Sequence, residues 1–259
     1  SLYGAIAGLP EAIETDSNFV FLKLYTASGN SIPSFMSFIA LIGPIIGLAL
    51  GFDSVNSERT SGTLNRLVSQ PIYRDSIIIG KFLAGTALIA VIIYAMGIAI
   101  GAAGILATGL KPGVEEVLRI LIFLTFTVIY VALASIAVWL FFAIFMSLVA
   151  TIVAGAIYPI NNDYYAAVNM FDNYTLELNL NRISPSYLYS EAVSIIMNPG
   201  ARTVNVVTMD QLIGAVSGYL SLGQSLLLVW PHLVGLAALM LIAFAGSYIG
   251  FMRQEVRTN

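Results

Sequence analysis

The stretch FLAGTALIAVIIYAMGIAIGAAGILATGL, residues 82–110, contains no charged side chain and lies between Lys81 and Lys111. As a helix it reaches roughly 43 Å at about 1.5 Å per residue, which is more than the hydrocarbon core of a bilayer, about 30 Å. Of the chain's 259 residues, 58% are hydrophobic and only 10% are charged, whereas soluble domains carry about 25% charged residues. The sequence therefore predicts a membrane protein.

Three further stretches without charge, residues 24–52, 120–162 and 211–252, are also long enough to cross a bilayer. The middle stretch is too long for one helix, so we predict a hairpin of two spans with its turn near residues 142–147. In the last stretch, residues 211–224 contain Gly, Ser and Gln and are predicted to approach the membrane without crossing it. The alternation of polar and apolar residues that marks the strands of a membrane barrel is not seen.

The predicted fold class is an all-α membrane protein, a polytopic helical bundle that forms one domain over residues 1–259. We predict five spans, at about residues 35–52, 77–108, 118–141, 146–160 and 226–252. The apolar residues 1–9 are interpreted as the outer end of a sixth helix whose beginning is missing. Three spans carry glycines four residues apart, which permits close helix packing although glycine is common in membrane helices anyway: Gly43 and Gly47, Gly97 and Gly101, and Gly246 and Gly250.

The basic residues predict the orientation, because positive charge collects in cytoplasmic connections. The loop between the first two predicted spans and the C-terminal tail together hold six basic and four acidic residues. The opposite side holds five basic and ten acidic residues. Residues 53–76 and the C-terminus are therefore predicted to be cytoplasmic, in a plasma membrane. Residues 1–34 and a large region at about 161–225 are predicted to lie outside.

The cytoplasmic loop contains the most informative stretch, SERTSGTLNRLVSQPIYRDSIIIGK, residues 57–81. Thr60 or Ser61 is expected to cap a short helix that ends at Pro71. One face of this helix carries three apolar side chains, Leu64, Leu67 and Val68, opposite Asn65, Arg66 and Ser69. Such a helix lies in the membrane interface or docks into a groove of another protein, and the pattern alone leaves both open.

The same stretch resembles the hallmark segment of ABC-2 type permeases. The resemblance rests on Glu58, Ser61-Gly62-Thr63-Leu64, Gln70-Pro71, Arg74 and Gly80-Lys81. Residues 251–257 are similar to the charged cytoplasmic exit of the last helix in that family. Ser184-Pro185 and Ser190-Glu191-Ala192 are similar, more weakly, to a segment of the permease subfamily that includes the nitrous oxide reductase maturation permeases.

The resemblance implies the transmembrane subunit of an ABC exporter, working as a dimer with a second permease copy and with separate ATP-binding subunits. In this family the segment is a coupling helix that contacts the ATP-binding subunit, which binds ATP and Mg. The residues implied to bind that partner are Glu58, Gly62, Thr63, Leu64, Leu67, Pro71 and Arg74. The substrate is not indicated.

Several classes of function are disfavoured by what the sequence lacks. Gly80-Lys81 is followed by Phe82 and not by Ser or Thr, so it is not a nucleotide-binding P-loop, and no cofactor is expected in this chain. With no cysteine and one histidine, His232, neither a cysteine nucleophile nor a metal cluster of such ligands is expected. The net charge of −3 leaves no basic face for nucleic acid. We predict that the chain is not an enzyme.

The alternative function is an ATP-independent secondary transporter or channel. An ion-coupled carrier places ionisable groups near the bilayer centre, whereas Lys81 and Arg119 lie near span ends and are expected to snorkel to the interface. Polar side chains in two spans are candidates for lining a transport path, with hydrogen bonding between helices as the alternative: Tyr94, Thr125, Tyr130 and Ser135.

In the predicted outer region, the acidic side chains are interpreted as a solvated surface. His232 is interpreted as an interfacial histidine, with a substrate or metal contact as the alternative. Pro231, beside it, is expected in the first turns of the last span, where a missing amide donor costs little. Asn173-Tyr174-Thr175 matches a glycosylation triplet, although such triplets are frequent by chance.

Overall fold

The computed structural model describes residues 19–26, 34–60, 74–109, 111–134, 139–159, 166–200 and 218–253. Within these ranges all regular structure is helical and no strand occurs, which confirms the all-α class. The helices are α2 (Val20–Thr26), α3 (Phe35–Thr60), α5 (Arg74–Thr108), α6 (Val114–Ala134), α7 (Trp139–Ile157), α8 (Ala166–Asn181), α9 (Pro185–Met197) and α11 (Leu222–Arg253).

Among the described residues, three helices are long and apolar enough to cross a membrane, over Asp75–Ala107, Val114–Ala134 and Leu222–Gly250. The apolar parts of α3 and α7, Phe35–Gly51 and Met146–Ile157, are shorter. All five predicted spans therefore correspond to apolar helices, and the number that crosses the bilayer stays a prediction. The proposed sixth helix at residues 1–9 lies outside the described residues.

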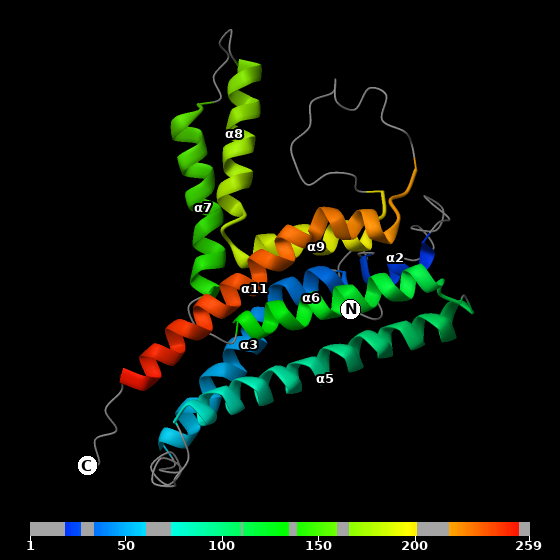
Figure 1. Ribbon diagram of the computed structural model, residues 1–259. Helices are drawn as coiled ribbons and strands as arrows, with labels where there is room; N and C mark the ends of the chain where they lie inside the picture. Colours follow the sequence, from blue (N-terminus) through cyan, green and yellow to red (C-terminus); the bar gives the residue numbers. More distant parts are fainter. Residues whose placement is uncertain are drawn as a thin grey trace.

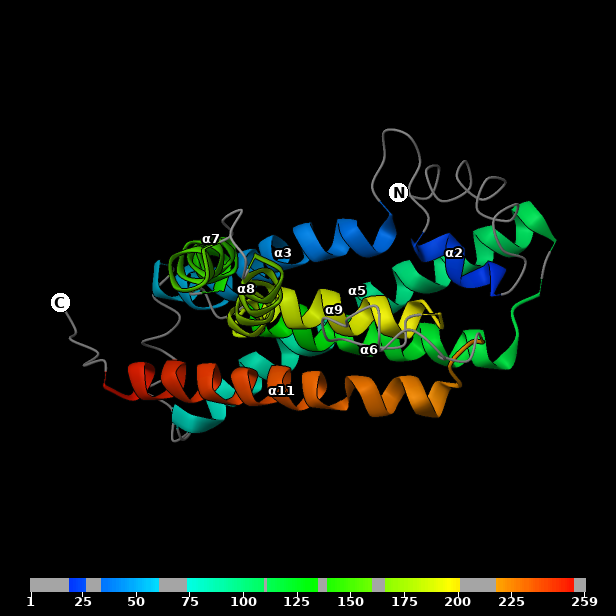
Figure 2. The same cartoon turned by 90° about the horizontal axis from the view of Figure 1, so that it is seen from above.

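The long helices α3, α5, α6 and α11 extend in the same general direction, and α9 lies along α6 and α11 (Figures 1 and 2). The end of α3, the start of α5 and the end of α11 gather at one end of this bundle. At the opposite end lie α2, the turn between α5 and α6, and the start of α11. Gly109 begins that turn with φ +69°, a left-handed conformation that glycine adopts without strain.

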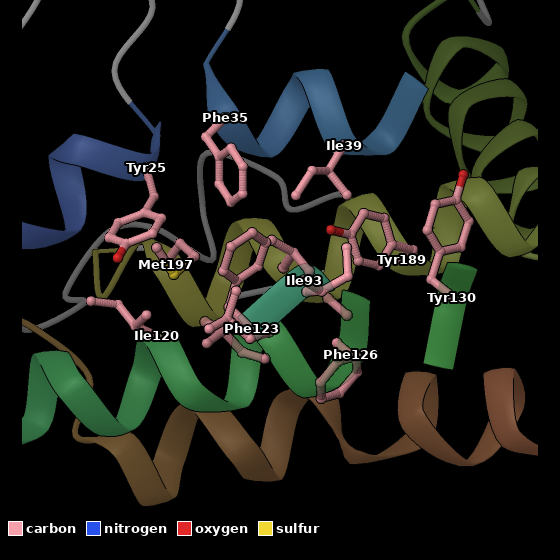
Figure 3. Close-up of a cluster of buried hydrophobic side chains, with 14 of the residues drawn as sticks. Tyr25, Phe35, Ile39, Ile93, Ile120, Phe123, Phe126, Tyr130, Tyr189 and Met197 are labelled. Atoms are coloured by element: carbon pink, nitrogen blue, oxygen red, sulfur yellow. The ribbon is translucent and has the colours of Figure 1, made fainter. Parts of the chain in front are cut away.

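The core of the bundle is aromatic where α2, α3 and α6 meet (Figure 3). Tyr25, Phe35 and Phe123 contact one another edge to face, with ring centroids 5.9 to 6.2 Å apart. All three side chains are buried, and this geometry is favourable for aromatic rings. The short helix α2 is therefore anchored inside the bundle by its own core residues.

Glycine residues allow neighbouring helices to approach α5 closely. An added Cβ at Gly97 would lie 2.6 Å from the methyl carbons of Leu124 on α6, and one at Gly101 would lie 3.0 Å from the Tyr25 hydroxyl. That hydroxyl donates a hydrogen bond of 2.8 Å to the Gly97 carbonyl. The pair in α11, Gly246 and Gly250, has open space around it among the described residues, so it serves no helix contact there.

One expectation about the second half of the chain is wrong. The turn predicted near residues 142–147 falls inside the continuous helix α7, and α6 already ends at Ala134. An apolar stretch without a charge gives no signal for the position of a break. Moreover, α7 pairs with α8, and this hairpin projects from the bundle, so that Figure 2 shows both helices end-on.

The predicted outer region contains two helices, α8 and α9, which sequence analysis did not identify. Helix α9 has Pro185 in its first turn and buries one face, including Tyr189, Val193 and Ile196, against α6 and α11. It is thus part of the core of the bundle and not a solvated loop.

Candidate functional site

The predicted coupling segment connects α3 to α5 in the sequence, and the end of α3 and the start of α5 lie at the same end of the bundle (Figure 1). Gly62, Thr63, Leu64, Leu67 and Pro71 lie outside the described residues. Glu58 lies in the last turn of α3 and Arg74 is the first residue of α5. The expectation that Thr60 caps a new helix is wrong, because α3 continues through Thr60.

The C-terminal end of α11 lies beside the start of α5, and therefore close to this segment. The ring of Phe82 on α5 contacts that of Phe244 on α11 at a centroid distance of 4.9 Å. The hydroxyl of Tyr248 also forms a hydrogen bond with the carboxylate of Asp75. The start of α5 is therefore in direct contact with the C-terminal part of α11.

The polar residues proposed for a transport path form hydrogen bonds between helices. The hydroxyls of Tyr94 on α5 and Thr125 on α6 form a hydrogen bond of 2.8 Å. Tyr130 on α6 donates a hydrogen bond of 3.0 Å to the Ala40 carbonyl on α3. Ser135 lies outside the described residues. The geometry accords with the alternative of helix packing, and a role in transport stays a prediction.

Tyr189 on α9 joins this group and was missed in the sequence. Its ring stacks on Tyr130 with a centroid distance of 4.2 Å and an interplanar angle of 4°, and its hydroxyl bonds that of Thr127 at 2.8 Å. Figure 3 shows the two tyrosines facing each other across the core. The sequence pattern did not indicate this contact, because Tyr189 lies 59 positions from Tyr130, in a region that was interpreted as polar.

Arg119 is fully buried, which corrects the expectation that it snorkels to the interface. Its guanidinium bonds the carboxylate of Glu115 one turn earlier on α6, with N–O distances of 2.9 and 3.1 Å. It also donates to the carbonyls of Ile196 at 2.9 Å and Leu220 at 2.7 Å, and to the hydroxyl of Ser225 at 3.1 Å. The charge is tolerated inside because acceptors from α9 and the start of α11 surround it.

A second buried charged cluster joins α9 to α11 through Glu191. Arg182, in the link between α8 and α9, holds this carboxylate with both Nη2 at 2.9 Å and Nε at 3.0 Å. His232 on α11 bonds it through Nε2 at 2.7 Å. Burial opposes ionisation of Glu191, but the hydrogen bonds from His232 and Arg182 outweigh it and hold its pKa below the ordinary value. The carboxylate is therefore charged at neutral pH.

This cluster corrects two interpretations. Glu191 is part of a partly buried ion pair and not of a solvated surface, and His232, only 5% exposed, is paired inside the protein rather than exposed. Pro231 is also not in the first turns, because α11 begins at Leu222. The partners are 9 and 41 positions from Glu191, so neighbouring sequence did not reveal them.

Asn173 is buried, and its side-chain amide donates a hydrogen bond of 2.8 Å to the Tyr158 carbonyl. It lies within α8, where a glycan would have no access. The glycosylation triplet is therefore a chance match, as the frequency of such triplets suggested.

A small apolar groove of about 40 Å³ lies between α3 and α5. Its lining includes Ile39, Ile46 and Leu50 of α3, Ile93 of α5 and Val131 of α6. All of its lining residues are apolar, so it offers no hydrogen bond that would orient a polar substrate. In the described part of the chain no group of three or more His, Cys, Asp or Glu is arranged to hold a metal ion.

Comparison with known proteins identifies relatives of the chain. The profile of the ABC-2 family transporter protein matches residues 5–256. The chain is similar to the probable ABC transporter permease protein NosY of Pseudomonas aeruginosa, 34% identical over 91 residues, which cover 35% of this chain and 32% of the relative. It is also similar to the probable ABC transporter permease protein NosY of Stutzerimonas stutzeri, 31% identical over 90 residues, which cover 34% and 33%. Each match thus spans about a third of the relative. No solved structure matches the chain significantly.

Proposed function

The chain belongs to the ABC-2 family of transporter proteins, and from this premise we propose that it is the permease subunit of an ATP-driven ABC exporter. The family match over nearly the whole chain carries the proposal. The names of the two relatives, probable ABC transporter permeases, support it.

The arrangement of the long helices supports a mechanical role for the segment at residues 56–70. Helix α3 leads into this segment and α5 leads out of it, and α5 continues for 35 residues to the opposite end of the bundle. Closure of ATP-binding subunits against the segment would tilt both helices. In this proposal ATP and Mg bind to those partner subunits, and the permease pairs with a second permease copy.

The charge distribution supports the orientation. We assign residues 53–76 and the C-terminus to the cytoplasmic side of a plasma membrane, which places α2 and the turn between α5 and α6 outside. The partner-binding residues are those of the resemblance: Glu58, Gly62, Thr63, Leu64, Leu67, Pro71 and Arg74.

The test uses the full chain, co-expressed and purified with the ATP-binding subunit that the proposal requires. Burial of Leu64, Leu67 and Val68 in the partner would contribute about 4 to 6 kcal/mol, and association costs a comparable amount. We therefore expect Leu67→Asp to release the ATP-binding protein and to abolish the ATP turnover of the complex. Asn65→Asp adds the same charge to the opposite face of the helix and is expected to leave both unchanged.

The permease alone is expected to show no ATP turnover. Retention of the ATP-binding protein by Leu67→Asp at the wild-type ratio would overturn the assignment of the coupling segment. Absence of any complex with the wild-type chain would overturn the proposed function itself.

A second candidate function is an ion-coupled secondary transporter. The structure favours it in one respect, because His232 lies within the apolar helix α11 and, like Arg119 of α6, is buried and paired. Ionisable groups of this kind are costly in a membrane and mark ion pathways in carriers. A chain that neither binds the ATP-binding protein nor alters its ATP turnover would support this candidate.

A further inference from the structure

We propose that Glu191 and His232 form a proton-binding site that controls how tightly α9 packs against α11. This inference goes beyond the proposed function, since it concerns a proton and not ATP, and it holds for either candidate function. It rests on the hydrogen-bond geometry of the cluster.

The proton-binding atom follows from the roles of the two ring nitrogens of His232. Glu191 is ionised and held by the fork of Arg182, so its oxygens only accept hydrogen bonds. The contact of 2.7 Å therefore requires that Nε2 of His232 carries hydrogen and donates it. In the neutral ring, Nδ1 then has a lone pair. Nδ1 is buried and has no hydrogen-bond partner in the described part of the chain, so this lone pair is available for a proton.

Protonation at Nδ1 changes the contact between the helices. A neutral imidazole gives Glu191 an ordinary hydrogen bond, whereas an imidazolium gives it a charge-assisted bond, which is about twice as strong. Imidazole is the side chain that changes charge near physiological pH. The contact between α9 and α11 therefore tightens as the pH falls and weakens as the pH rises.

The surrounding charges make the proton exchangeable. Arg182 also pairs with the carboxylate of Glu191, so a single negative charge is shared by two cations. The charged form of His232 is therefore stabilised less than it would be in an isolated pair. The side chains of Arg182 and Glu191 are 22% and 11% exposed, so this side of the cluster lies near the protein surface. A site that is to gain and lose a proton needs both features.

Other titratable and charged groups lie on the elements packed against α9 and α11. Tyr187 and Tyr189 lie on α9 itself, where Tyr187 interacts electrostatically with Glu191 and with Glu177 of α8. The groups on α6 are Tyr130, Glu116 and the pair of Arg119 with Glu115, and those on α5 are Asp75, Lys81 and Tyr94. The described side chains of α3 and α7 contain no titratable group. The response is assigned to His232 because its ring bonds Glu191 through Nε2 and leaves Nδ1 without a partner in the described part of the chain.

The experiment measures the distance between α9 and α11 as a function of pH in the full chain, reconstituted in lipid nanodiscs. Because the chain has no cysteine, spin labels can be attached at two introduced sites, Ser194→Cys on α9 and Leu227→Cys on α11, both of which are exposed. Labels at Leu121→Cys on α6 and Leu227→Cys form the control pair. Pulsed electron paramagnetic resonance then gives distance distributions at pH 5.5 and pH 8.5.

We expect the ratio of close to separated distances for the α9–α11 pair to fall roughly fivefold from the lower to the higher pH, as the difference between a charged and a neutral hydrogen bond implies. The control pair is expected to stay constant. His232→Gln keeps a donor but cannot titrate, so its distances should not change with pH. If His232→Gln does not insert, Glu191→Gln answers the same question, since without the carboxylate the pH response should disappear. Distances that do not depend on pH in the wild type, or a response that persists in the variant, would overturn the proposal.

Discussion

At the scale of single residues, Arg119 is the side chain whose loss should cost most. It connects α6 to the end of α9 and to the entry of α11 through three acceptors besides Glu115. Ile196 supplies a carbonyl from the last turn of α9, where the helix dipole favours a cation. The side chain therefore holds three separate segments together at one end of the bundle.

We predict that Arg119→Met lowers the free energy of unfolding by about 3 kcal/mol, because it leaves the carbonyls of Ile196 and Leu220 without their donor. Thermal unfolding of the purified chain in detergent measures the effect. Lys111→Met removes an exposed positive charge at the same end of the bundle and is the control, with an expected change within about 0.5 kcal/mol. Equal unfolding temperatures for the two variants would contradict the role given to Arg119.

Residue roles of this kind could not be predicted from the sequence alone. Arg119 and His232 each lie in or beside an apolar stretch, and a lone charge in that position is compatible with either snorkelling or burial. Whether such a charge is buried depends on partners that are distant in the sequence. The two carbonyls that accept hydrogen bonds from Arg119 lie 77 and 101 positions away. Only the packing of α9 against α6 and α11 brings these partners together.

At the scale of helices, the sequence predicted the helix bounds best where a charged residue lies at each end of the apolar stretch. Lys81 and Lys111 limit the stretch that became most of α5, and the structure places the helix at Arg74–Thr108. The position of the break between α6 and α7 could not be predicted, because no charged residue, glycine or proline marks it. Helix α9 was missed because Ser190, Glu191 and Ser194 stand between its apolar residues in the sequence, although these polar residues lie on the side of the helix opposite its buried face.

Glycine spacing gives a prediction at this scale. We expect Gly97→Val to destabilise the chain by about 2 kcal/mol, because the added carbons meet Leu124 in a packed interface between α5 and α6. Gly246→Val, in an open position on α11, should not destabilise it by overpacking. Thermal unfolding of both variants distinguishes the two sites, and a larger loss for Gly246→Val would show that this face of α11 is packed.

At the scale of the whole molecule, the ends of α3 and α11 and the start of α5 lie together, as the five-span prediction required. An odd number of spans places the loop after the first span and the C-terminal tail on the same side of the membrane. The common position of these ends, with Tyr248 bonded to Asp75, agrees with that arrangement. Which side of the membrane this is depends on the charge bias alone.

The last prediction tests the side by labelling intact cells with a membrane-impermeant maleimide. Asn173, although assigned to the outside, is buried and unsuitable as a reporter, whereas Lys111 is exposed in the turn between α5 and α6. Single cysteines at Asn65→Cys and Lys111→Cys enter a chain that has none of its own. Because the sequence segments predicted to be cytoplasmic, which include Asn65, hold six basic residues, we expect labelling of Lys111→Cys only, and labelling of both variants once the cells are permeabilised. Labelling of Asn65→Cys alone in intact cells would reverse the orientation, and the coupling segment would then face away from any cytoplasmic ATP-binding subunit.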